Sequence, residues 1–80
     1  MIKLLYFAAL VDMLGCASEE LAAPLPSDVR GLLALLQHRG GTWDNVFSKS
    51  SVRITVNKQF AKLNTPLKDG DEVAFISAWI

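Results

Sequence analysis

The side chains best suited to nucleophilic or acid–base chemistry are one cysteine and one histidine, Cys16 and His38. Cys16 could be a sulfur-handling thiol, but no obvious base or cation flanks it to lower its pKa, so a half-buried structural cysteine is favoured. A solvated histidine at a helix end is favoured for His38. No Cys/His set has metal-ligand spacing, and no Ser/His/Asp arrangement or glycine-rich phosphate loop is evident. We therefore expect no catalytic residue, no metal site and no cofactor bound by this chain.

Composition and charge exclude several classes of partner. Eight basic and eight acidic residues give a formal net charge of zero, and no basic run supplies a footprint for a nucleic-acid backbone. A single cysteine permits no internal disulfide, which suits a reducing compartment. The longest apolar run, residues 4–11, is far too short to cross a bilayer. We expect a cytoplasmic protein that binds neither nucleic acid nor membrane.

One main helix is predicted from the spacing of apolar residues. Ser27 is the expected N-cap, because its hydroxyl can accept a hydrogen bond from the first turn. Asp28 then places negative charge at the positive end of the helix dipole. Gly40-Gly41 is expected to end the helix. Four residues at helical spacing form its apolar face: Val29, Leu32, Leu33 and Leu36.

Strands are predicted on both sides of this helix. Asn57-Lys58 predicts a tight hairpin turn, with Phe60 and Leu63 on its return strand. The strand before the turn is marked by alternation of Val52, Ile54 and Val56 with polar residues. The other expected elements are a strand over residues 2–8, a short helix over 8–14, a strand over 19–23, a turn of helix around 43–47 and a last strand over 72–80.

This order of elements predicts a single domain over residues 1–80. The fold class is α+β, with a mixed sheet of about five strands packed on one main helix. The first and last strands are the most apolar, so we expect them side by side at the centre of the sheet. This arrangement is the β-grasp, or ubiquitin-like, layout.

Three segments together resemble a known family. They are "MIKLLYFAAL" at the start, the Pro-Ser-Asp helix start, and "VNKQFAKLNTPLKDGDEVAFI" near the end. The full chain is similar to the MoaD/ThiS family of ubiquitin-like sulfur carriers, which includes the small subunit of molybdopterin synthase. The resemblance implies a carrier that an ATP-dependent adenylating enzyme activates at a C-terminal glycine. The resulting thiocarboxylate enters the large synthase subunit and donates sulfur to a precursor of the molybdenum cofactor.

The end of the chain departs from this family pattern. Trp79 and Ile80 follow the last strand where the family has a short segment and then Gly-Gly. No residue can therefore be assigned as the thiocarboxylate carrier, and either the chain is truncated or altered, or it is a relative that transfers no sulfur. The alternatives to a carrier are a non-catalytic β-grasp interaction module and a self-associating domain.

A partner-binding surface is also implied by the resemblance. Phe7, Phe60 and Ile76 match positions that form an apolar contact patch on the family's sheet. The alternation of the first strand agrees, because Phe7 should point away from the helix. Trp79 and Ile80 are further candidates for partner contact, although Trp79 is equally compatible with docking on its own sheet. The expected partners are the large synthase subunit, the adenylating enzyme where a Gly-Gly tail exists, or a second copy of the chain.

Overall fold

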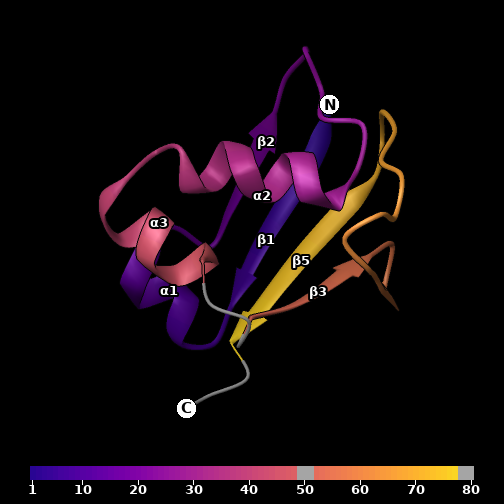
Figure 1. Ribbon diagram of the computed structural model, residues 1–80. Coiled ribbons are helices and arrows are strands. Elements are labelled where there is room, and N and C mark those ends of the chain that lie inside the picture. The colour runs from indigo at the N-terminus through magenta and orange to yellow at the C-terminus, as the bar shows by residue number, and fades with distance from the viewer. Residues whose placement is uncertain (49–51, 78–80) are drawn as a thin grey trace.

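The first and last strands lie side by side at the centre of the sheet, as predicted (Figure 1). The computed structural model describes residues 1–48 and 52–77, and within them the sheet has five strands in the order β2-β1-β5-β3-β4. The β1–β5 pair is parallel, and the other pairs are antiparallel. The bounds of the strands are β1 Ile2–Phe7, β2 Ser18–Leu21, β3 Val52–Val56, β4 Gln59–Phe60 and β5 Glu72–Ser77.

Helices cover one face of this sheet. In Figure 1, α2 crosses the sheet over β1 and β2, and α1 and α3 lie together near one end of it. Gly15 follows α1 in the left-handed conformation, with φ 79°, which explains why the first helix ends there. The bounds of the helices are α1 Ala9–Leu14, α2 Val29–Gln37 and α3 Gly41–Phe47.

The core lies between the helices and the inward face of the sheet. Alternate residues of β1 are buried, because successive side chains of a strand point to opposite faces. Val29, Leu32 and Leu36 of α2 pack against them, which confirms the predicted helical face. Tyr6 stacks on Phe75 with ring centroids 5.5 Å apart, and this contact joins β1 to β5 across the core. The β1 and β5 side chains buried here are Ile2, Leu4, Tyr6, Val73 and Phe75.

The predicted N-cap of the main helix is wrong by one residue. Asp28, in an extended conformation, caps α2, and its carboxylate accepts a hydrogen bond from the Gly31 N–H at 2.9 Å. The carbonyl of Ser27 instead accepts a bond from the Leu67 N–H. Ser27 therefore belongs to a contact with the chain that precedes β5, and the capping position moves to the next residue.

The return strand of the hairpin is shorter than predicted. Asn57 and Lys58 form the tight turn with φ values of 51° and 70°, as expected, but β4 ends at Phe60. The carbonyl of Leu63 accepts a hydrogen bond from the Arg30 N–H at the start of α2, and its side chain is 46% exposed. Leu63 was expected on the strand, and this expectation is wrong because its backbone carbonyl is hydrogen-bonded to the start of α2 instead.

Replacing Asp28 with alanine should lower the free energy of unfolding by about 1 kcal/mol, since the Gly31 N–H loses its acceptor. Ser27→Ala is the matched control and should change stability by less than about 0.5 kcal/mol. Urea unfolding followed by circular dichroism measures both variants. A larger loss for Ser27→Ala than for Asp28→Ala would contradict the observed cap.

Candidate functional site

The face of the sheet opposite the helices is the first candidate site. Phe7 lies opposite Ile76 across the β1–β5 pair, and Arg53 lies opposite Ile76 across the β3–β5 pair. Phe60 lies opposite Thr55, which shares its side of β3 with Arg53. The structure therefore brings Phe7, Phe60 and Ile76 to one side of the sheet, which we call the open face.

Apolar side chains remain accessible on the open face. Phe60 is 76% exposed and Phe7 is 45% exposed, while Ile76 is half-buried between its neighbouring strands. Leu5 and Ala74 lie opposite each other in the next row, so the apolar surface continues along the sheet. A strand surface turned to water normally carries polar residues, and this composition is typical of a surface that a partner covers. Trp79 and Ile80, the other predicted contact residues, lie outside the described residues.

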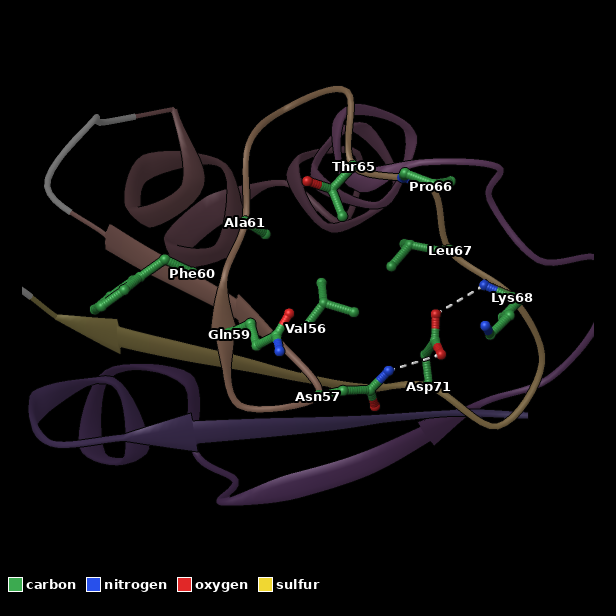
Figure 2. Close-up of a pocket in the computed structure, with 10 residues that line it drawn as sticks. All are labelled: Val56, Asn57, Gln59, Phe60, Ala61, Thr65, Pro66, Leu67, Lys68 and Asp71. Atoms are coloured by element: carbon green, nitrogen blue, oxygen red, sulfur yellow. Dashed lines mark hydrogen bonds between the residues drawn. The ribbon is translucent and has the colours of Figure 1, made fainter.

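A buried carboxylate lies between the hairpin turn after β3 and the start of β5 (Figure 2). Asp71 is 4% exposed and accepts bonds from Asn57 Nδ2 at 3.0 Å and from the Lys68 N–H at 2.9 Å. The hydrogen bond from Asn57 is the main cause that lowers the pKa of Asp71, and burial opposes it. Asn57 Oδ1 in turn accepts from the Glu72 N–H. This network joins the hairpin turn to the start of β5.

A small hollow of about 310 Å³ lies beside this network. In Figure 2 the Asp71 carboxylate is directed toward Asn57 and Lys68, and the Phe60 ring points away at the other end of the hollow. Both carboxylate oxygens have partners, so the arrangement is satisfied without a ligand. We assign it a structural role. Sequence analysis predicted only the Asn57-Lys58 turn here, and the position of Asp71 directly after Gly70 was the available signal.

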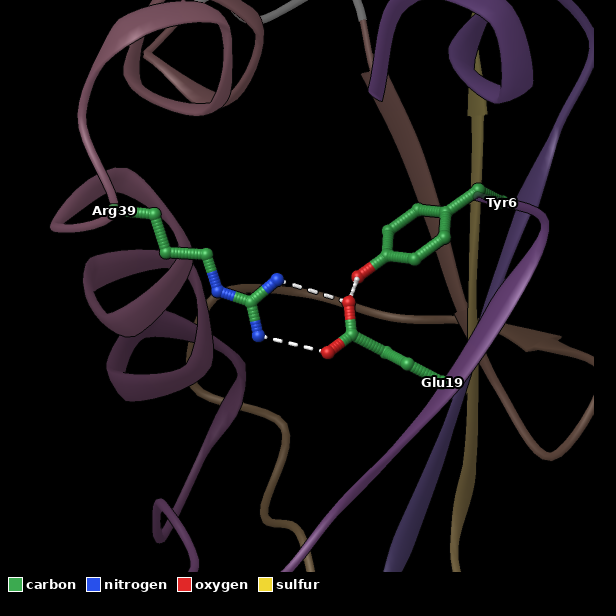
Figure 3. Close-up of polar contacts among 3 residues, drawn as sticks. All are labelled: Tyr6, Glu19 and Arg39. Atoms are coloured by element: carbon green, nitrogen blue, oxygen red, sulfur yellow. Dashed lines mark hydrogen bonds and ion pairs between the residues drawn. The ribbon is translucent and has the colours of Figure 1, made fainter. Parts of the chain in front are cut away.

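A second polar cluster ties β2 to the segment after α2 (Figure 3). Arg39 donates two hydrogen bonds to the Glu19 carboxylate, at 2.8 and 2.9 Å, and the Tyr6 hydroxyl donates a third at 2.8 Å. The guanidinium also lies 4.3 Å from the centre of the Trp43 ring. These contacts lower the pKa of Glu19, chiefly through the Arg39 hydrogen bond. Burial is the main cause that raises the pKa of Tyr6, so the cluster contains no group prepared for proton transfer at neutral pH.

Cys16 and His38, the side chains best suited to nucleophilic or acid–base chemistry, belong to different segments: Cys16 precedes β2 and His38 follows α2. Cys16 is half-buried, and burial is the largest cause that raises the pKa of its thiol, followed by the nearby charge of Glu19. A thiol in this environment is a weak nucleophile. His38 is exposed at the C-terminal end of α2. Over residues 1–48 and 52–77, no cluster of His, Cys, Asp or Glu side chains could hold a metal ion.

A helix can cross a bilayer only if it is long and apolar enough to span the hydrocarbon core. None of the described helices has the length and apolar character needed to cross a bilayer.

Comparison with known proteins gives consistent matches. Residues 4–79 match the model of the ThiS family. The molybdopterin synthase sulfur carrier subunit of Escherichia coli is 33% identical over 94% of this chain and 91% of its own. A putative molybdopterin converting factor subunit 1 from Pyrococcus furiosus has a TM-score of 0.77 at 27% identity, covering 95% of this chain and 94% of its own.

The fold has a further match at lower identity. A structure of the complex of subunits 1 and 2 of molybdopterin-converting factor from Helicobacter pylori matches with a TM-score of 0.68 at 23% identity. The match covers 95% of this chain and 90% of that chain. This likeness supports the β-grasp fold.

Asn57→Gly should destabilise the protein by about 1 kcal/mol at neutral pH, because Asp71 loses its side-chain donor while the positive φ of the turn is kept. The folded state lowers the pKa of Asp71 below 3.8, so its contribution is present above pH 3.8 and lost as the pH falls through the folded-state pKa. The stability difference between wild type and variant should therefore shrink in acid. Urea unfolding at a series of pH values measures it, and a difference that stays constant down to about pH 2 would contradict the assignment.

Proposed function

This chain belongs to the ThiS family, and we propose from this premise that it serves as the sulfur carrier subunit of a molybdopterin synthase. The observation that carries the proposal is the relationship to the Escherichia coli carrier subunit, which extends over 94% of the chain. The role belongs to molybdenum cofactor biosynthesis, in the cytoplasm, and needs no cofactor bound by the chain itself. In this role the chain is bound and positioned by its partner and needs no nucleophile of its own. The weakly nucleophilic thiol of Cys16 agrees with this role.

The open face is the proposed contact surface for the large subunit of the synthase. Phe7, Phe60 and Ile76 lie on the same side of three different strands, so one flat partner surface can touch all of them. Phe60 can bury a large apolar area on binding because 76% of it is exposed. Its strand is held by the Asp71 network, so little conformational freedom is lost when a partner docks.

Self-association is the competing use of the same surface. The formal net charge is zero, so charge repulsion between copies is weak, and the open face exposes aromatic side chains. The two uses differ in the species formed. Light scattering after size-exclusion chromatography separates a dimer of this chain from a complex with the large subunit.

Phe60→Ala and Phe7→Ala should each weaken binding to the large subunit by about tenfold or more, because a few buried side chains carry most of the binding energy of an interface and exposed aromatic residues are strong candidates for them. Leu35→Ala is the matched control, since Leu35 of α2 and Phe7 are both 45% exposed and only Phe7 lies on the open face. Isothermal titration calorimetry measures affinity, and circular dichroism checks the fold. If the phenylalanine variants bind as tightly as Leu35→Ala, the open face is not the interface.

Sulfur carriage is proposed for the form of the protein that ends in Gly-Gly, after activation by an ATP-dependent adenylating enzyme. If the native protein carries sulfur, its intact mass should rise, after sulfur loading, by the difference between one sulfur and one oxygen atom. A native protein whose mass equals that of a chain ending at Ile80, and that gains no sulfur, would contradict sulfur carriage. Partner binding would then be the remaining proposed role.

A further inference from the structure

A second, larger groove lies on the helix side of the sheet, beside β3. Its volume is about 670 Å³, more than twice that of the hollow beside Asp71. One wall comes from α2 and α3 through Leu33 and Phe47. The other wall comes from Val52 and Ile54 of β3 and from the segment that follows β4, which includes Leu63.

The groove exists because the helices cover the sheet unevenly. Figure 1 shows α2 over β1 and β2, with β3 on the far side of β5 from it. The inward residues of β5, Val73 and Phe75, are 0% exposed. Val52 and Ile54, which share the inward face of β3, are only half-buried. Apolar side chains on the inward side of a strand are normally covered by a second layer, and β3 has only part of one.

Among the described residues, the charged side chains that line the groove have one sign. Arg53 and Lys62 are its charged lining residues, and both are cationic and exposed. The apolar floor therefore has a basic rim. A complementary occupant combines apolar side chains with carboxylates, because it fills the floor and pairs with the rim.

The groove is continuous with the open face. Phe60 and Arg53 line the groove, and both lie on the open face in the strand register. A partner that covers the open face therefore reaches the edge of the groove at Phe60. A single protein can occupy both surfaces by passing around the short β4 edge.

We propose that this groove binds an acidic, apolar segment of the same protein that docks on the open face. The inference rests on the proposed function, in which that protein is the large subunit of the synthase. The segment places apolar side chains against Ile54 and Leu63 and a carboxylate beside Lys62. The groove thus adds a second contact area on the helix side of the sheet.

The test uses the full chain, the large subunit and two groove variants. Lys62→Glu should weaken binding by about tenfold, because it places like charges together, and Leu63→Ala should weaken it by about fivefold. Lys62 and Leu63 are exposed, so neither change should disturb the core. Lys58→Glu is the matched control, since Lys58 makes the same charge change in the hairpin turn and lines neither hollow.

Calorimetry with the large subunit gives distinguishable outcomes. Weaker binding by both groove variants, with Lys58→Glu like wild type, supports the proposal. If both groove variants bind like wild type while Phe7→Ala weakens binding, the groove proposal is overturned and the open face stands. If the wild-type chain does not bind the large subunit, the proposed function fails and takes the groove proposal with it. A change in the oligomeric state of the groove variants alone would identify a second copy as the occupant and overturn the proposal as stated.

Discussion

The parallel pairing of β1 with β5 places the first and last strands of the described chain side by side at the centre of the sheet. Lys3 lies opposite Glu72, so the pair closes a loop that contains every other element. Closing a long loop costs conformational entropy, which must be offset by burial of apolar surface. Tyr6 and Phe75 meet that need where they stack, and Phe47 of α3 packs its ring edge-on against Phe75 with centroids 5.1 Å apart. The helices are thereby fixed against the strands that the pairing brings together.

The central β1–β5 pair also explains why the open face of the sheet is apolar. Parallel strands are usually covered on both faces, whereas antiparallel strands tolerate water on one. Here helices cover only the inward face, and the outward row of the parallel pair contains Leu5, Phe7, Ala74 and Ile76. The outward row has the composition of a second buried face, and no helix of residues 1–48 and 52–77 covers it. A partner supplies that layer most economically, and the same reasoning applies to the half-covered β3.

The sequence predicted the features that depend on residues close together in the chain, and it missed those that depend on contacts between distant segments. Alternation, helical spacing and apolar runs depend on near neighbours, and they predicted the strands and the main helix. The apolar character of the first and last strands predicted their central position. Ser27 and Asp28 are both good capping residues, and a distant contact from Leu67 decided between them. Leu63 left the predicted strand for a similar reason, because Arg30 at the start of α2 uses its carbonyl.

The features of the candidate site also fall into those that the sequence predicted and those that depend on distant contacts. The family resemblance predicted Phe7, Phe60 and Ile76 on one surface, and strand alternation agreed for Phe7. The structure places all three on one face of the sheet, and their contact with a partner stays a prediction. The Asp71 network was missed, since its partners Asn57 and Lys68 meet it only after the hairpin folds beside β5. The groove beside β3 had no local signal at all, because its walls come from elements far apart in the sequence.

Among the described residues, the shortest strand carries the most exposed aromatic side chain, and this combination requires support from other segments. A two-residue strand has few ladder hydrogen bonds, so β4 would move freely without further contacts. Asn57 holds one side of β4 through Asp71, and the Leu63 carbonyl holds the other side through the start of α2. Phe60 therefore lies on a segment that is fixed at both ends. It also lies where the open face meets the groove beside β3. A rigid aromatic side chain loses little entropy on binding, so the contacts that were least visible in the sequence are those that prepare the surface for a partner.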